Sequence, residues 1–496
     1  MKIKNDLIGI AFLTYCIVLG SSCKNNLDTP DIAPKGDTLE TPWQFNTPLP
    51  FDQPSSASLR AMDKKVFAHY FTQFPISIDN NPAASDYYQT GYLNPNGENG
   101  KHIAYGGFLR NRPLPRPVRP ETNWMDLDMD EEVRLAAALG IDGFACDLLS
   151  YQGYHLDRTK MLLEAANRKG DGFKIMLMPD IEAFKTIPES LTNLIKTLAA
   201  YPAAYRLKDG RLVVAPYNAQ GLTATWWTNW LTSMKNQGID IALFPVFQDW
   251  SKYAPNYAPI SYGMSDWGWR STKIQASWKD VPAKAKAFGP IWMMPVAPQD
   301  MRPYSQTYSE AANSAEYRVM WENAIQGGAD WVQLITWNDY SENTSIRPST
   351  RTQYSYYDLT AYYTTWFKTG TKPEIKRDVL YYFYRIHSTS APTIQSKPFT
   401  TAAGTDAPSN QIELLAFLVS PGTLEIEIDG KVTRQDAPAG MSSFLVPLSN
   451  GKPIFRLLRE NNSIIVLPGA FEINNMITYQ NLLYYGGSNS RPAVNK

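Results

Sequence analysis

Short apolar runs alternate with amphipathic stretches from Lys64 to residue 338. The runs have the length of strands, and the stretches between most of them repeat with helical period. Parallel strands covered by helices are buried on both faces, so continuous apolar runs are expected of them. Eight runs fit, at 66–71, 140–149, 173–181, 211–219, 241–250, 259–269, 290–298 and 331–338. The helical stretches are 130–139, 157–169, 188–200, 224–236, 277–288 and 309–327. We predict an α/β fold, a (β/α)₈ TIM barrel over 63–388.

The composition of the chain and the period of its apolar residues change after residue 388. Ser, Thr, Ala and Pro dominate to residue 410, and strand-period runs follow that are separated by Asp-Gly, Asn-Gly and Pro-Gly turns. These runs are 412–419, 423–429, 442–448, 453–460 and 463–469. Short strands with such turns predict a β-sandwich over 389–496. Few aromatic residues line up along these strands, so we expect the sandwich to brace the barrel rather than to bind carbohydrate.

The N-terminus has the pattern of a lipoprotein signal peptide. Two lysines precede an apolar run from Leu7 to Leu19, and small residues then lead to Cys23. The run is too short to cross a bilayer, which takes roughly 20 helical residues. We therefore predict a signal peptide at 1–23, lipidation of Cys23, and a Pro- and Asp-rich tether at 24–62. The expected location is the bacterial cell envelope, lipid-anchored on the periplasmic or cell-surface face.

The amino-acid composition limits the kinds of molecule that this protein is expected to bind. Lys+Arg and Asp+Glu are both 47, so nothing indicates a nucleic-acid groove. The 14 Trp and 29 Tyr suit stacking on sugar rings. Four scattered histidines and the absence of CxxC, GxGxxG and GxSxG motifs argue against metal, cofactor and serine-hydrolase chemistry. We expect a monomer that uses no cofactor and acts on an uncharged polysaccharide, with Cys146 a buried thiol.

Polar and aromatic residues gather where the apolar runs end. The C-terminal ends of barrel strands build the active site of this fold, so these side chains are expected to converge. His69 could equally satisfy a core hydrogen bond, and each aspartate could pair with an arginine or a backbone amide. Arg302, beyond the seventh run, is a further candidate. The predicted substrate-binding residues are His69, Asp147, Asp180, Tyr217, Asn218, Trp250, Asp266, Trp267, Trp337, Asn338 and Tyr340.

Asp339 and Glu342 stand three residues apart just after the last run. Hydrolysis of a glycosidic bond needs one protonated acid for the leaving oxygen and one carboxylate to activate water or attack the sugar. An isolated D-x-x-E pair often caps a helix or faces solvent. The place of this pair at the end of the eighth predicted strand, beside Trp337 and Tyr340, favours catalysis.

The segment LITWNDYSE at 334–342 resembles the LxTWNDYGES signature of glycoside hydrolase family 71, the α-1,3-glucanases or mutanases. VFAHYF and GIDGFACD resemble the family's FAHF and GIDAFALN segments, and similarity continues through 359–387 and the C-terminal strands. The resemblance implies an inverting α-1,3-glucan hydrolase in which Asp339 and Glu342 are catalytic. We expect Glu342 to be the acid and Asp339 the base, with the exchanged roles left open. Ser341 and Asn343 depart from the family pattern at the edge of the site.

Two other functions stay open at this point. The layout distantly resembles glycoside hydrolase family 99, so another α-linked polysaccharide such as α-mannan is an alternative substrate. A surface lipoprotein that binds glycan without cleaving it is the second alternative. Such a protein can lose its acid and base, so the presence of both Asp339 and Glu342 speaks against it. Endo or exo action is not readable from the residues.

Overall fold

The computed structural model describes residues 48–289 and 291–491. The predicted signal peptide, Cys23 and most of the predicted tether lie outside the described residues. Within the described part of the chain, no helix is long and apolar enough to span a membrane.

The centre of the described chain is a closed ring of parallel strands. Its hydrogen-bonded order is β5-β4-β3-β2-β1-β11-β8-β7-β6. β5 and β6 stand at opposite ends of this order, yet only Phe244 and Pro245 separate them in the chain. They are two halves of one strand, and the ring closes through them. The strands are β1 (Lys65–Tyr70), β2 (Gly143–Leu148), β3 (Lys174–Pro179), β4 (Leu212–Val214), β5 (Ile241–Leu243), β6 (Val246–Phe247), β7 (Gly263–Asp266), β8 (Ile291–Val296) and β11 (Trp331–Leu334).

This ring is the predicted (β/α)₈ barrel, and each of the eight predicted runs overlaps one of its strands, counting β5 and β6 as two halves of the fifth. The fifth strand is interrupted at Pro245 because proline has no N–H to give to a neighbouring strand. All neighbouring strands in the ring run parallel. The prediction of the fold class from apolar runs is confirmed.

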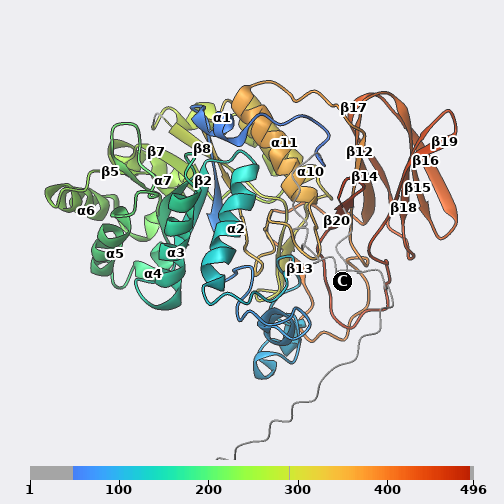
Figure 1. The fold of residues 1–496 in the computed structure, drawn as a ribbon, viewed down its shortest axis with the longest axis horizontal. Coiled ribbons are helices and arrows are strands. Elements are labelled where there is room, and N and C mark those ends of the chain that lie inside the picture. The colour runs from blue at the N-terminus through green and yellow to red at the C-terminus, as the bar shows by residue number, and fades with distance from the viewer. Residues whose placement is uncertain (1–47, 290, 492–496) are drawn as a thin grey trace, which may run out of the picture. The chain divides into compact units, whose positions relative to one another are not determined.

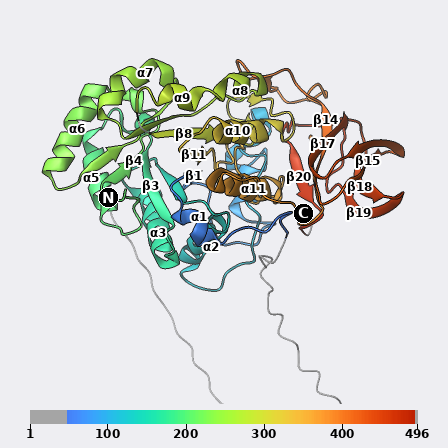
Figure 2. The ribbon, with the colours of Figure 1, turned by 90° about the horizontal axis from the view of Figure 1, so that it is seen from above.

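Helices lie around the outside of the strands (Figures 1 and 2). They are α1 (Ser56–Ala61), α2 (Trp124–Ala138), α3 (Gly153–Lys169), α4 (Ile181–Phe184), α5 (Glu189–Ala199), α6 (Ala224–Asn236), α7 (Trp250–Tyr257), α8 (Thr272–Trp278), α9 (Val281–Ala285), α10 (Ala315–Gln326) and α11 (Ser355–Thr369). Single helical turns occur at Tyr88–Tyr92, Glu98–Gly100, Ile103–Tyr105, Ala219–Gly221 and Ala258–Ile260. The sequence pattern did not predict α7, which contains Pro255.

The predicted helix at 309–327 begins later than expected, at Ala315. The preceding segment forms a small sheet outside the barrel instead. β9 (Asp300–Arg302) and β10 (Thr307–Ser309) make an antiparallel hairpin, and β13 (Thr400–Thr401) joins β10 in parallel. This sheet matters for the site, because β9 carries Asp300 and Arg302 and because β13 belongs to the segment that leads into the C-terminal strands.

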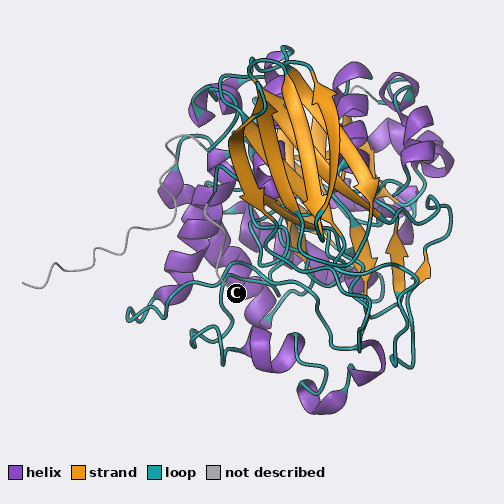
Figure 3. Ribbon diagram, turned by 90° about the vertical axis from the view of Figure 1, so that its right-hand side faces the viewer, coloured by secondary structure: helices purple, strands orange, loops and turns teal. Residues whose placement is uncertain are grey.

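The C-terminal strands form two four-stranded sheets, ordered β17-β14-β12-β20 and β16-β15-β18-β19 (Figure 3). Neighbouring strands are antiparallel in both. Tyr382 of the first sheet stacks on Phe455 of the second with ring centroids 5.2 Å apart, inside one apolar cluster. The strands are β12 (Val379–Tyr384), β14 (Gln411–Leu418), β15 (Gly422–Ile428), β16 (Lys431–Ala437), β17 (Gly440–Pro447), β18 (Ile454–Arg459), β19 (Asn462–Pro468) and β20 (Tyr485–Ser488). The predicted β-rich C-terminal region is confirmed.

The first of these sheets is buried on both faces. Its inner face meets the second sheet, while Phe417 and Phe383 on its other face pack against Tyr362 and Tyr356 of α11. β14 is accordingly buried along nearly its whole length. β12 precedes residue 388 yet pairs with β14. The domain boundaries themselves stay a prediction.

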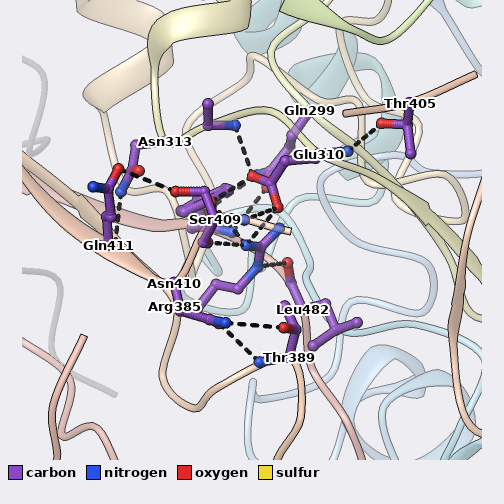
Figure 4. A network of polar contacts seen from close by, with 12 residues as sticks. Gln299, Glu310, Asn313, Arg385, Thr389, Thr405, Ser409, Asn410, Gln411 and Leu482 are labelled. Carbon is purple, nitrogen blue, oxygen red and sulfur yellow. Dashed lines mark hydrogen bonds and ion pairs between the residues drawn. The ribbon is translucent and has the colours of Figure 1, made fainter. Parts of the chain in front are cut away.

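A buried polar network joins the barrel side to these strands (Figure 4). Arg385 and Glu310 are both 1% exposed and form an ion pair, Nη1 to Oε2, at 3.0 Å. The hydroxyl of Tyr484 donates to the other oxygen of Glu310 at 2.6 Å, and Arg385 Nε donates to the carbonyl of Leu482 at 2.9 Å. Buried charges are stable only when they are paired and hydrogen-bonded in this way.

We predict that Arg385→Met destabilises the protein by about 3–5 kcal/mol, because it leaves Glu310 buried without its cation. Denaturant unfolding of the wild type and the variant measures this free energy. Lys208→Met is the control: its ion pair with Asp63 has side chains 94% and 93% exposed and should be dispensable. Equal losses for the two variants would contradict the role given to the network.

Candidate active site

The carboxyl ends of the strands bring together several of the predicted residues. The indole of Trp267, just after β7, contacts the imidazole of His69 from β1 edge-on, with ring centroids 4.7 Å apart. The same indole meets Tyr217, after β4, also at 4.7 Å. Burial lowers the pKa of His69 to about 3, so its imidazole is neutral at ordinary pH. These three rings form an aromatic cluster at the barrel mouth.

Asp339 is 3% exposed and its carboxylate is held by the loop that follows β11. Three donors converge on Oδ1: the Ser341 amide at 2.8 Å, the Ser341 hydroxyl at 2.7 Å and the Glu342 amide at 3.0 Å. Burial raises the pKa of Asp339, while these donors and Arg302 lower it. Hydrogen bonds to a carboxylate favour its ionised form. The loop therefore keeps Asp339 as the more acidic group of the pair.

Glu342 has a different environment. Its Oε1 lies 2.8 Å from Nη1 of Arg302, and its Oε2 is buried with no hydrogen-bond partner among the described residues. Burial, more than the nearby charge of Asp339, raises the pKa of Glu342 to about 8, although Arg302 opposes the rise. A carboxyl with this pKa is mostly protonated at neutral pH. The structure thus places a carboxyl group of raised pKa beside a hydrogen-bonded carboxylate, and glycoside hydrolysis requires an acid and a carboxylate of this kind.

Arg302 is fixed by Asp300, its neighbour two residues earlier on β9. Nε and Nη2 of Arg302 bind the two Asp300 oxygens at 2.8 and 2.6 Å, which leaves Nη1 for Glu342. Nε of Arg270 lies 3.8 Å from Asp300, and both of these side chains are buried. Two guanidinium groups and one carboxylate thus stand behind Glu342. Arg302 was only a further candidate in the sequence, and nothing in the pattern indicated Asp300, because neither lies at the end of a barrel strand.

Asp147 and Asp180 extend the acidic character of the mouth. Asp147 is the penultimate residue of β2 and is buried, and its Oδ1 has no hydrogen-bond partner within the described chain. Burial raises its pKa well above the usual range, and the charges of Asp180, Asp339 and Glu342 raise it further. Asp180 caps α4 by accepting from the amide of Glu182 at 2.8 Å. The protonated form of Asp147 is therefore favoured near the pair, whereas Asp180 also has a local structural role.

Three other predicted residues hold the site from behind. The Trp337 indole N–H donates to Glu132 of α2 at 2.8 Å, on the helix side of the barrel. The Asn338 amide binds backbone groups of Phe71 and Phe74 after β1, and Tyr340 packs edge-on against Phe74. These contacts fix the loop after β1 and the loop after β11 to each other. They lend no support to the substrate-binding roles predicted for Trp337, Asn338 and Tyr340.

The last three predicted residues lie at strand ends but make mainly local contacts. Asp266 accepts from the amides of Trp250 and Gly268, each at 2.7 Å, and burial raises its pKa to about 6. Trp250 packs on Trp292 with ring centroids 5.3 Å apart. Asn218 adopts a left-handed backbone with φ 52° and donates to Glu182. Their substrate-binding roles stay predictions.

Among residues 48–289 and 291–491, no group of three or more His, Cys, Asp and Glu side chains is arranged to hold a metal ion. Cys146 is buried beside Thr159, and burial raises the pKa of its thiol to about 12. A thiol with this pKa is a weak nucleophile. The chemistry of the described site is carried by carboxyl groups.

Comparison with known proteins agrees with this geometry. Residues 118–495 match glycosyl hydrolase family 71. The chain belongs to this family. Two relatives are a mutanase from Penicillium rubens, 23% identical over 73% of this chain and 84% of its own, and a glucan endo-1,3-alpha-glucosidase from Schizosaccharomyces pombe, 22% identical over 73% and 91%.

One similar solved structure is an endo-alpha-mannosidase of family GH99 from Bacteroides thetaiotaomicron. It has 17% sequence identity and a TM-score of 0.49, and the match covers 62% of this chain and 98% of that one.

We predict that Arg302→Met moves the pH range of activity to higher pH by about one unit or more. Arg302 lowers the pKa of both Glu342 and Asp339, so both values rise when its charge is removed. The bell-shaped profile of kcat/KM reports these two groups in the free enzyme. Arg302→Lys keeps the charge and should shift the profile less.

Arg434→Met is the control for this experiment, since Arg434 is a half-exposed cation on β16 that pairs with Glu425. Its profile should match the wild type. If the Arg302→Met profile also matched the wild type, Arg302 would not set the acidity of the carboxyl pair.

Proposed function

We propose that this protein hydrolyses the α-1,3-glucosidic bonds of glucan, with Glu342 as general acid and Asp339 as general base. The observation that carries the proposal is the contrast within the pair: one carboxyl has an oxygen with no hydrogen-bond partner in the described chain and a raised pKa, and the other accepts three hydrogen bonds. Membership of a glycosyl hydrolase family supports the reaction class.

Glu342 gives its proton to the glycosidic oxygen. Arg302 holds Oε1, so the proton resides on Oε2, which has no partner in the described chain and is free to donate. As the bond from the anomeric carbon to that oxygen breaks, the electron pair stays on the oxygen, which takes up the proton. Arg302 then stabilises the carboxylate that remains.

Asp339 activates the water molecule. Its Oδ1 is occupied by the three donors of the loop, so Oδ2 accepts the proton of water as the oxygen of that water attacks the anomeric carbon. Attack from the face opposite the leaving group inverts the α-linkage to a β-anomer. In the aromatic cluster of His69, Tyr217 and Trp267, the half-buried Tyr217 offers apolar surface for a sugar ring at the mouth.

The choice of α-1,3-glucan rests on the relatives, whose names are mutanase and glucan endo-1,3-alpha-glucosidase. α-Mannan is the second candidate substrate, and it is suggested by the sequence alone. We expect reducing sugar from insoluble α-1,3-glucan and little from α-mannan. The opposite result would reject the proposed substrate and retain the proposed reaction.

Asp339→Asn and Glu342→Gln should each lower kcat by roughly 10²–10⁴-fold, because each removes one proton-transfer step and little volume. Release of reducing sugar measures the rate, and thermal unfolding verifies that both variants fold. Asp249→Asn, on the exposed edge of the loop before α7, is a matched control and should keep its rate. Near-normal rates for both catalytic variants, or no release by the wild type, would reject the mechanism. Proton NMR of the first product should show the β-anomer.

We also propose that the mature protein is a monomer anchored to the outside of a bacterial membrane through lipid on Cys23, as its N-terminal pattern suggests. In a bacterial host, Cys23→Ser should move the protein from the membrane fraction to the soluble fraction without changing its specific activity. Cys146→Ser, at the buried thiol, is the control that should stay with the membrane. A membrane-bound Cys23→Ser variant would contradict lipid anchoring.

A further inference from the structure

A cavity of about 260 Å³ opens beside Arg302. Three segments far apart in the sequence line it: residues 267–270 after β7, the β9–β10 hairpin, and Ala402 with Ala403 after β13. Pockets for drug-sized ligands measure roughly 300–1,000 Å³, so this cavity suits something smaller, such as one sugar ring.

The cavity shares two side chains with the catalytic centre. Trp267 lines it and also contacts His69 and Tyr217 at the barrel mouth. Arg302 lines it and also binds Glu342 at 2.8 Å. A ligand in the cavity would therefore lie one side chain away from the proposed acid, which is the position of a neighbouring unit on a bound polysaccharide.

The lining has the chemistry that binds a neutral sugar. Trp269 leaves 48% of its surface exposed, although it is among the largest apolar side chains, so its indole is available for stacking on a sugar ring. Hydroxyl groups on the hairpin, at Ser305 and Thr307, line the same space. Asp300 is also in the lining, and both of its carboxylate oxygens are paired with Arg302.

The segment that leads to the C-terminal sheets is locked in place as the third wall. β13 pairs with β10, and the Asp406 carboxylate accepts from the amide and hydroxyl of Thr272, each at 2.6 Å, at the start of α8. Gly404 adopts φ +77°, and a Cβ there would meet the Trp269 ring at 3.2 Å. The 402–404 segment therefore packs closely against the Trp269 indole.

We propose that this cavity is a subsite for one glucose unit adjacent to the cleaved bond, with Trp269 as its stacking platform and the 402–404 segment as its wall. The proposal rests on the proposed function for the identity of the sugar. It gives the segment that enters the C-terminal sheets a part in substrate binding, through Ala402 and Ala403, in addition to bracing.

Two variants test the subsite from opposite sides. Trp269→Ala removes the platform, and Ala403→Phe fills the cavity from an exposed position that tolerates a larger side chain. On α-1,3-linked glucose oligosaccharides of two to six units, each should lower kcat/KM by about tenfold at every length, because even the disaccharide places a unit on each side of the cleaved bond. Trp366→Ala on α11 and Ala200→Phe after α5 do not line the cavity and are the matched controls.

The outcomes separate this proposal from the proposed function. If the wild type hydrolyses the oligosaccharides and both cavity variants match the controls at every length, the subsite is rejected and the function stands. If the wild type releases no sugar, the function is rejected, and fluorescence titration with glucose and mannose oligosaccharides decides the subsite. Weaker binding by both cavity variants than by the controls then supports it. Equal binding, or no binding by the wild type, overturns it.

Discussion

Burial of carboxyl groups at the mouth of the barrel is the constraint on which the rest of the site depends. Loss of solvent is the largest cause of the raised pKa of Asp147, Asp339 and Glu342 alike. An ionised carboxylate without compensation is too costly to keep in such a place, so the groups must share protons or find cations and hydrogen-bond donors. The Asp339 carboxylate accepts hydrogen bonds from its own loop, and the Glu342 carboxyl group pairs with Arg302. These two environments give chemically similar side chains different acidities, so that one can act as an acid and the other as a base.

The cation in this arrangement comes from outside the barrel strands. Arg302 belongs to β9, which is held by β10, and β10 is held in turn by β13 on the way to the C-terminal sheets. The buried ion pair of Arg385 and Glu310 joins the end of β10 to the end of β12. The position of one guanidinium thus depends on the packing of both halves of the described chain. The C-terminal sheets therefore belong to the structural support of the active site.

The WNDYSE segment at 337–342 shows which features of the site the sequence predicts and which it does not. Its place at the end of the eighth apolar run was predicted, and the loop there does hold Asp339 and Glu342 next to each other. The neighbours Trp337, Asn338 and Tyr340 were predicted to bind the substrate, which stays a prediction, and the structure shows that they pack against α2 and the loop after β1. Adjacent residues in a tight loop point in different directions. A sequence pattern shows which residues share a loop, but side-chain direction depends on backbone angles that only the folded loop defines.

What the sequence by itself determined is the repeated order of strand and helix, the strand-rich C-terminal region and the residue types at the strand ends. It did so because periodicity and burial act locally, within one element at a time. Only the tertiary structure decided that Arg302 reaches Glu342, that Asp300 orients it, and that Ala402 and Ala403 close a cavity around Trp269. The Arg302–Glu342 contact and the cavity join segments separated by tens of residues outside the repeating pattern. The first depends on the pairing of charges and the second on the packing of loops, and both are satisfied in three dimensions and leave no period in the sequence.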